Sequence, residues 1–274
     1  MGWSQLLFCF PTRGHCPDQV NGSKAQEEQL EEEPFTDPSR HLAYCHHLRD
    51  VQPPQEAQRP QPTALIYDPL VDNPASTGFT EACSGLLVKA GFRVEIVSGG
   101  STTVESIRNP RQAALIIYRV HSSVFNNGVW FFTGEPYSNS AYVLEQLANE
   151  VHIGRTSQDA NYTFAVGARF VQRYMKDRLR GAIVVLMGCD GLAEQDLAEA
   201  FIEAGAVAYV SWDGPVTLPH TDAATLSFVE GLAGLGMSIE DAIHYAEERV
   251  GPEVPYNSSM VFYPREAGGL KLIG

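Results

Sequence analysis

A cysteine and a histidine that together could carry out acyl transfer follow two strongly apolar runs of the chain. Cys189 comes just after the run at residues 182–187, and His121 stands near the end of the run that begins at Ala113. A histidine beside a cysteine can deprotonate the thiol, or form an ion pair with it, and later protonate a leaving amine. The two residues therefore suggest covalent acyl transfer, provided that the fold brings them together.

The element that carries Cys189 is predicted from the residues on both sides of it. Residues 182–187 are apolar and rich in β-branched side chains, which is typical of a strand buried on both faces of a parallel sheet. Apolar residues with helical spacing follow at 197, 200, 201 and 204. Cys189 is thus expected where a strand runs into a helix N-terminus, which favours a thiolate. The alternative is that Cys189 is a small buried core residue, since free cysteines are among the most often buried residues.

Strands and helices alternate along most of the chain. We predict strands at 63–70, 93–99, 113–123, 182–187 and 206–213, and a final edge strand at 258–264. Helices are expected near 79–90, 141–149, 164–179, 197–204, 221–235 and 239–250. Gly91 is the expected C-cap of the first, Thr221 is a candidate N-cap, and Ser238 with Asp241 resembles a capping box before the last. A hairpin with Asn126-Asn127-Gly128 as its turn and a loop at 133–140 are also expected. This alternation predicts an α/β fold, specifically a three-layer αβα sandwich around a mainly parallel sheet.

The predicted topology brings the chemistry-bearing residues to one edge of the sheet. His121, Cys189 and the pair Trp212-Asp213 all stand at the ends of predicted strands. If consecutive parallel strands are neighbours, their carboxyl ends meet in one cleft. The backbone N–H groups of Ser122 and Cys189 are then candidates for an oxyanion hole.

Three short motifs give the chain a resemblance to a known superfamily. A histidine ends the third strand, Gly188-Cys189-Asp190-Gly191 ends the fourth, and Ser211-Trp212 ends the fifth. This arrangement resembles the caspase-like cysteine peptidases, which include caspases, metacaspases, gingipains, separases and CHAT domains. Over about residues 63–264 the chain looks most like uncharacterised prokaryotic members. The resemblance implies a caspase-like sheet and a catalytic dyad of His121 and Cys189.

The chain also departs from the pattern of that superfamily. The residue after the histidine is usually glycine and here is Ser122, and the carboxylate of Asp190 next to the cysteine would raise the thiol pKa. In caspases an arginine after Ser-Trp binds an acidic substrate side chain, whereas this chain has Asp213. Asp190 and Trp212 are further candidate substrate-binding residues. Because Asp213 reverses the charge of the caspase arginine, we expect cleavage after arginine or lysine. Alternatively, Asp213 caps a turn before Gly214-Pro215.

Three functional hypotheses follow from the sequence. The first is a cysteine endopeptidase that acts on a peptide or protein substrate with no cofactor and no metal ion. The second is a catalytically inactive caspase-like module that binds peptides or partners. The third is a flavodoxin-like or Rossmann-like enzyme, which needs a phosphate-binding glycine loop after the first strand; residues 68–78 (DPLVDNPASTG) do not supply one.

Composition limits the class of protein further. The 274 residues include 19 Lys and Arg against 33 Asp and Glu, and the formal charge of -14 argues against a nucleic-acid partner. No apolar run is long enough for a transmembrane helix. The five cysteines lack CxxC spacing, which argues against a disulfide framework or a zinc ribbon. The sequence indicates neither the oligomeric state nor the compartment; the cytoplasm is favoured slightly, and secretion stays open.

The N-terminal residues differ in composition from the rest. Residues 1–62 contain an acidic run and a segment rich in Pro and Gln, which cannot bury a core, so we expect a low-complexity extension followed by a domain at 63–274. The cluster formed by His41, Cys45, His46 and His47 is not expected to bind metal. His220 and Glu135 are candidates for the rim of the cleft, whereas His15, His152 and His244 have no partner pattern.

Overall fold

A computed structural model describes residues 61–156, 160–254 and 256–272, which belong to one compact unit that begins at Gln58. The predicted extension at 1–62 lies outside the described residues except for its last two positions. The strands are β1 (Thr63–Asp68), β2 (Arg93–Ser98), β3 (Leu115–Tyr118), β4 (Ser122–Phe125), β5 (Gly128–Pro136), β6 (Val151–Gly154), β7 (Thr163–Gly167), β8 (Ile183–Leu186), β9 (Ala208–Trp212) and β10 (Met260–Tyr263). The α-helices are α2 (Phe79–Lys89), α3 (Val104–Arg108), α4 (Val143–Leu147), α5 (Ala168–Tyr174), α6 (Asp196–Glu203), α7 (Leu218–Val229) and α8 (Ile239–Val250).

The strands form two sheets. The six-stranded sheet has the order β10-β9-β8-β3-β1-β2, and every neighbouring pair is parallel except β9 and β10. The second sheet is antiparallel, with the order β4-β5-β7-β6. The prediction of an α/β fold with a mainly parallel sheet is therefore confirmed, and the antiparallel sheet is an addition that the sequence reading did not include.

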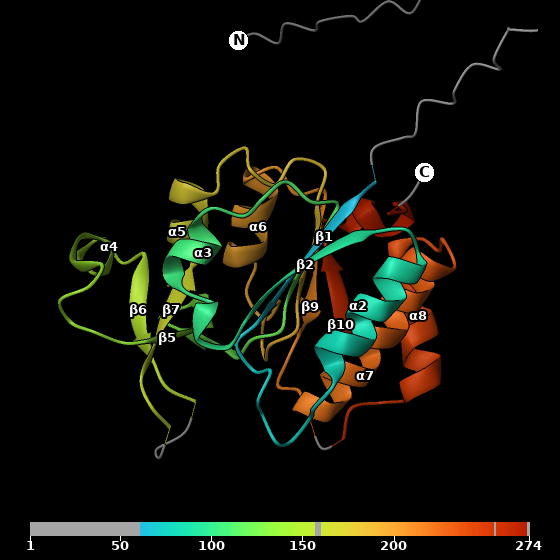
Figure 1. Cartoon of the computed structure of the whole chain (residues 1–274), viewed down its shortest axis with the longest axis horizontal. Helices are drawn as coiled ribbons and strands as arrows, with labels where there is room; N and C mark the ends of the chain where they lie inside the picture. The colour runs from blue at the N-terminus through green and yellow to red at the C-terminus, as the bar shows by residue number, and fades with distance from the viewer. Residues whose placement is uncertain (1–60, 157–159, 255, 273–274) are drawn as a thin grey trace, which may run out of the picture. The chain divides into compact units, whose positions relative to one another are not determined.

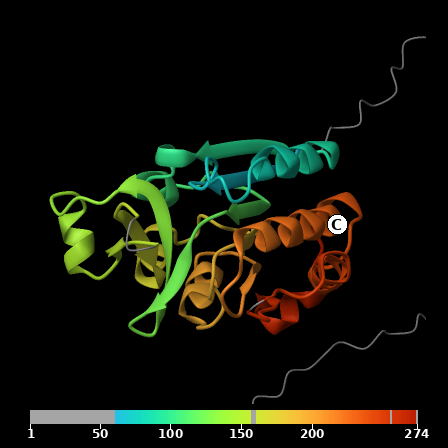
Figure 2. The same ribbon diagram turned by 90° about the horizontal axis from the view of Figure 1, so that it is seen from below.

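Both faces of the six-stranded sheet are packed against helices. Successive side chains of a strand point to opposite faces, so Leu65 and Tyr67 of β1 join one apolar cluster while Ala64 and Ile66 join the other. The first cluster includes α3, α5, α6 and the antiparallel sheet, and the second includes α2, α7 and α8. Figures 1 and 2 show these two groups of elements on opposite sides of the central strands. Because β1, β3 and β8 are covered on both faces, every residue in them except Thr63 is buried.

Several predicted boundaries are wrong, each because a tertiary contact decides the local structure. The helix expected at 164–179 begins only at Ala168, since Thr163–Gly167 pairs with β5 and β6 in the antiparallel sheet. The strand expected at 113–123 divides into β3 and β4. Thr221 is not an N-cap, because α7 begins one turn earlier, after Thr217. Part of the loop expected at 133–140 extends β5.

Other local signals are confirmed. Asn126 and Asn127 have φ values of 51° and 58° and form the turn between the antiparallel strands β4 and β5. The Ser238 hydroxyl accepts a hydrogen bond from the Asp241 N–H at the start of α8. Gly91 follows α2 with a φ of 89°, where a glycine C-cap was expected. None of the helices in the described part of the chain has the length and apolarity needed to span a bilayer.

Candidate active site

Cys189 lies just beyond the carboxyl end of β8. The pairing of β8 with β3 continues for one residue, because the Met187 N–H donates to the Tyr118 carbonyl at 2.9 Å. A series of turns follows, and Asp190 takes a positive φ of 57°. The next helix, α6, starts only at Asp196. The prediction that a helix N-terminus directly adjoins the thiol is therefore wrong, since six residues separate the cysteine from the helix.

The thiol of Cys189 is half-buried and is held by the backbone of a neighbouring loop. Its Sγ lies 3.4 Å from the Val216 carbonyl oxygen and 3.5 Å from the Val216 nitrogen. Burial raises the pKa of the Cys189 thiol, the Val216 backbone contact lowers it, and the carboxylates of Asp190 and Glu253 raise it further. The net direction is upward, so the neutral thiol is the resting form. Cys83, in contrast, is fully buried in α2, and burial raises its pKa to about 12.

His121 lies in the connection between β3 and β4, and its side chain is half-buried. It lines a cavity of about 310 Å³ together with Leu70 and Asn73 of the loop after β1 and Phe132 of β5. Burial lowers the pKa of His121, and the nearby charge of Arg119 lowers it further. Within the described ranges the imidazole makes no hydrogen bond, either to the Cys189 thiol or to any other group. The structure thus brings the two strand ends together without pairing the thiol and the ring.

Ser122 connects the two strand ends directly. Its hydroxyl donates to the Cys189 carbonyl at 2.6 Å. A Cβ at Gly188 would overlap this hydroxyl and would lie 2.8 Å from the Ser122 nitrogen. On the other side, the Ser211 hydroxyl donates to the Leu186 carbonyl at 2.7 Å and occupies the space where a side chain at Gly191 would be. The serine at 122 and both glycines of the cysteine motif therefore form one closely packed unit around the loop.

This packing predicts a cost for adding a methyl group at Gly188. We expect Gly188→Ala to destabilise the protein by about 1–3 kcal/mol, the usual range for overpacking. Ser122→Gly should restore part of that loss, because it removes the hydroxyl that the methyl group meets. Urea unfolding of the two single variants and the double variant measures this coupling. Purely additive losses would show that Ser122 and Gly188 do not share the contact.

The three predicted substrate-binding residues lie in different surroundings. Asp190 is half-buried, burial raises the pKa of its carboxyl group, and this carboxyl group has no hydrogen-bond or ion-pair partner among the described residues. Trp212 is buried, and its indole N–H donates to the Thr221 hydroxyl at 2.9 Å. Asp213 is exposed, but one carboxylate oxygen accepts the Ser259 N–H at 2.8 Å. Of the two aspartates, Asp190 therefore has the carboxylate that is more available to a ligand.

The remaining candidates have structural contacts of their own. Glu135 accepts the Val104 N–H at the start of α3, at 2.9 Å, and does not line the His121 cavity. His220 lines a separate cavity and pairs with Glu253 at 3.1 Å. His152 and His244 are exposed or partly exposed and contact neighbouring polar side chains.

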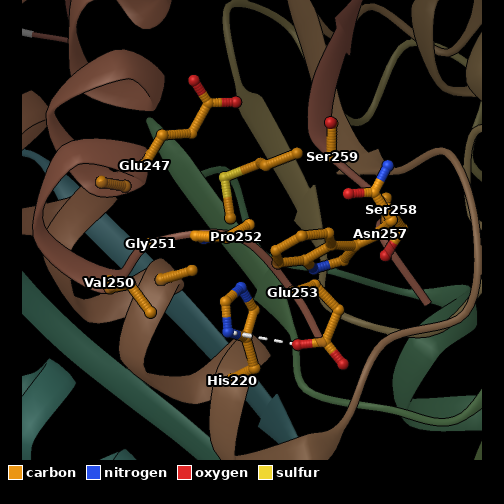
Figure 3. A pocket seen from close by; sticks show the side chains of 13 residues that line it. His220, Glu247, Val250, Gly251, Pro252, Glu253, Asn257, Ser258 and Ser259 are labelled. Atoms are coloured by element: carbon orange, nitrogen blue, oxygen red, sulfur yellow. Dashed lines mark ion pairs between the residues drawn. The ribbon is translucent and has the colours of Figure 1, made fainter. Parts of the chain in front are cut away.

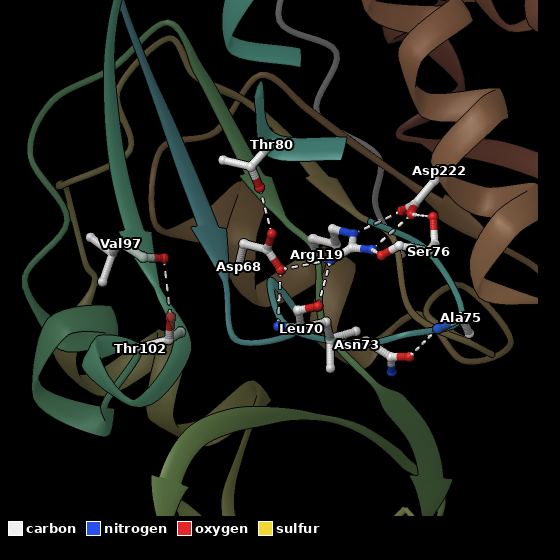
Figure 4. Close-up of polar contacts among 10 residues, drawn as sticks. All are labelled: Asp68, Leu70, Asn73, Ala75, Ser76, Thr80, Val97, Thr102, Arg119 and Asp222. Atoms are coloured by element: carbon white, nitrogen blue, oxygen red, sulfur yellow. Dashed lines mark hydrogen bonds and ion pairs between the residues drawn. The ribbon is translucent and has the colours of Figure 1, made fainter. Parts of the chain in front are cut away.

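The sequence reading missed a buried ionic cluster next to the candidate site. Arg119, two residues before His121, is only 1% exposed and bonds to Asp68 at 3.0 Å and to Asp222 through two nitrogens at 2.8 Å (Figure 4). It also donates to the carbonyls of Leu70 and Ser76. The cluster therefore fixes the loop after β1, whose residues line the His121 cavity. A lone arginine in the apolar run at 113–120 was the available signal for a buried ion pair.

In the described part of the chain, no group of three or more His, Cys, Asp or Glu side chains is arranged to hold a metal ion. No protein-family model matches the sequence, and no curated protein matches it.

Proposed function

We propose that the protein is a cysteine endopeptidase of the caspase-like type, with a His121–Cys189 dyad in a three-layer αβα sandwich. The observation that most supports this proposal is the hydrogen bond from the Ser122 hydroxyl to the Cys189 carbonyl at 2.6 Å. It joins the residue after the histidine to the cysteine itself, at the carboxyl ends of adjacent parallel strands. That edge is the usual ligand-binding position of open α/β sheets.

The proposed reaction begins from a neutral thiol and a neutral imidazole, because burial raises the pKa of Cys189 and lowers that of His121. His121 takes the proton from the Cys189 sulfur as the sulfur attacks the scissile carbonyl carbon. The resulting imidazolium then gives this proton to the leaving amine, and a thioester remains on Cys189. Water, deprotonated by His121, hydrolyses the thioester and releases the free thiol and the carboxylic acid.

The backbone N–H groups of Ser122 and Cys189 are the proposed donors to the oxyanion of the tetrahedral intermediate. One such donor is typically worth about 3 kcal/mol of barrier. The Ser122 side chain supports this arrangement, because its bond to the Cys189 carbonyl fixes the peptide plane that follows Cys189. A serine in the usual glycine position is therefore compatible with a role in orienting the cysteine loop.

The proposed substrate preference is for a basic residue before the scissile bond. Asp190 supplies a half-buried carboxylate without a partner among the described residues, next to the nucleophile. A basic side chain there gains a charge-assisted hydrogen bond, whereas an acidic side chain meets like charge. Asp213 can contribute its remaining carboxylate oxygen, since the other one accepts the Ser259 N–H.

Profiling with a peptide library tests this preference. We expect cleavage after Arg and Lys and no cleavage after Asp. Asp190→Asn should reduce the preference by about tenfold or more, since the lost interaction is charge-assisted and partly desolvated. Asp213→Asn should have a smaller effect because Asp213 is exposed. A preference for Asp, or an unchanged basic preference in both variants, would show that other residues form the pocket.

The pH dependence of thiol alkylation gives a second test. Burial, Asp190 and Glu253 raise the pKa of Cys189, so its alkylation rate should keep rising at pH values where an ordinary exposed cysteine has levelled off. Asp190→Asn removes a negative charge that disfavours the thiolate, and it should shift this profile to lower pH. The measurement is the rate of iodoacetamide alkylation against pH, with Cys189→Ala as the blank. An alkylation profile that levels off near neutral pH would contradict the raised pKa of Cys189.

A second candidate function is a caspase-like module that binds peptides without cleaving them. Two observations favour it: the thiol contacts the Val216 backbone, and the imidazole of His121 has no partner in the described ranges. Binding of a basic peptide by wild type without any hydrolysis, and with no loss of binding in Cys189→Ala, would support this alternative.

A further inference from the structure

A second cavity lies beside the candidate site, between α7, α8 and the segment that leads into β10. It has a volume of about 310 Å³, which is large enough for a long side chain. Its apolar walls come from Trp212 of β9, Ala224 of α7, Val250 of α8, and Met260 of β10. Figure 3 shows the polar groups His220, Glu247 and Glu253 on its other sides.

The titratable groups that line this cavity are two carboxylates and one histidine. The buried carboxylate of Glu253 accepts the Thr217 N–H at 3.0 Å and pairs with Nδ1 of His220 at 3.1 Å. In the neutral ring this pairing places the hydrogen on Nδ1 and leaves Nε2 as an acceptor, and Figure 3 shows this second nitrogen pointing into the cavity toward Pro252. Glu247 adds a second carboxylate at the edge of the cavity, where it is exposed, points away from His220 and lies 4.0 Å from Nδ1 of His244.

Positive charge is missing from the walls of the cavity. None of its lining residues is lysine or arginine. The cavity also adjoins Gly251, where α8 ends, and the carbonyl end of a helix favours cations. Trp212 presents an aromatic ring of the kind that binds organic cations. An organic cation with an apolar stem therefore matches the cavity in charge, hydrogen bonding and shape.

We propose that this cavity is a binding site for a guanidinium or ammonium group on an aliphatic stem, the chemistry of an arginine or lysine side chain. The charged group binds at Nε2 of His220, whose ring pairs with the buried Glu253 carboxylate, and Glu247 adds a more distant negative charge. The stem packs against Trp212 and Val250. Only the identification of the ligand as a side chain of a peptide substrate rests on the proposed peptidase function. The cavity is separate from the free carboxylate of Asp190, so it provides a second site for basic residues.

A loop shared with the thiol connects the cavity to Cys189. On one side, the loop at 213–217 holds the Cys189 sulfur through Val216 and accepts the Asp190 N–H at Gly214, at 2.9 Å. On the other side, its Pro215 carbonyl accepts the Ser258 hydroxyl at 2.6 Å, and Ser258 lines the cavity. The charge of Glu253 also contributes to raising the Cys189 pKa. A bound cation should therefore lower this pKa and speed thiol alkylation at a fixed pH.

The test is calorimetric titration of the full-length chain with agmatine, a small guanidinium compound, at low salt. We expect saturable binding of one agmatine per chain, weakened roughly threefold by Glu247→Gln, since that carboxylate is half-exposed and screened. Glu253→Gln should weaken binding more strongly. If that variant does not fold, Ala246→Leu, which fills the cavity from α8, should abolish binding. Glu248→Gln is the matched control, because Glu248 neighbours Glu247 but does not line the cavity.

Several results would overturn the site. These are no saturable binding at millimolar agmatine, an equal loss of affinity in Glu248→Gln and Glu247→Gln, and tighter binding of the anion glutarate than of agmatine. Failure of the proposed function gives a different pattern, in which agmatine binds as expected but no peptide is cleaved. Conversely, cleavage after basic residues without agmatine binding would support the peptidase proposal and exclude this cavity as a binding site for basic side chains.

Discussion

Cys189→Ala and His121→Ala should each reduce hydrolysis of a basic peptide by at least about 10⁴-fold, the scale of single losses from a catalytic unit. Both side chains are half-buried, so neither truncation should leave a large core cavity, and the melting temperature should change little. Turnover of a fluorogenic peptide and thermal unfolding of the same preparations measure the two effects.

Two matched variants act as controls for these losses. Cys83→Ala changes the other described cysteine, which is fully buried in α2, and it should retain turnover while losing some stability. His152→Ala changes a histidine in β6 of the antiparallel sheet whose ring contacts Trp130 and not Cys189, and it should retain turnover. Undiminished turnover in Cys189→Ala or His121→Ala would exclude the dyad. A large fall in melting temperature in Cys189→Ala would indicate a core cysteine instead.

Arg119→Met should destabilise the fold by about 3–5 kcal/mol, because it leaves the carboxylates of Asp68 and Asp222 buried without their cation. The arginine is 1% exposed, and both of its ion pairs are shielded from water. Urea unfolding gives the free energy directly. Arg93→Met is the control: Arg93 pairs with Glu95 at an exposed position, and its loss should cost less than about 1 kcal/mol.

A second measurement on these variants separates the cluster from a role in catalysis. If Arg119 only holds the loop after β1, Arg119→Met should recover most of the wild-type turnover when it is assayed at a temperature low enough for the variant to be fully folded. A loss of stability below 1 kcal/mol in Arg119→Met would contradict the view that the cluster is a necessary part of the fold.

The parallel sheet was predictable because its strands are buried on both faces. The runs at β1, β3 and β8 are mostly apolar, and these strands lie side by side and parallel in the sheet, although β1 rather than β2 is the neighbour of β3. The turn at Asn126-Asn127 and the cap at Ser238 were predictable for a local reason, since each residue type satisfies a backbone requirement by itself.

The antiparallel sheet was not predictable in the same way. The apolar residues at 163–167 fit the start of a helix as well as a strand, and only pairing with β5 and β6 selects the strand. The same is true of Thr221, which suits an N-cap but lies within α7, where its hydroxyl accepts the Trp212 indole N–H and donates to the Met187 carbonyl. Long-range contacts decide both cases, and no local pattern encodes them.

The candidate site shows the same division. The positions of His121 and Cys189 after neighbouring strands follow from the order of the apolar runs. The contacts around the site do not, because the Val216 contact with the Cys189 thiol and the Glu253 contact with His220 join segments 27 and 33 residues apart. Asp213 illustrates the limit: its charge was evident in the sequence, but its bond to Ser259 was not.

The most direct test of the proposed dyad is labelling with an arginine-containing peptide that carries a thiol-reactive acyloxymethyl ketone, followed by mass mapping of the labelled residue. We expect one adduct, on Cys189, that is lost in Cys189→Ala and forms much more slowly in His121→Ala. Labelling of Cys83 or of another cysteine instead, or an adduct on Cys189 that forms equally fast in folded His121→Ala, would contradict the proposed dyad.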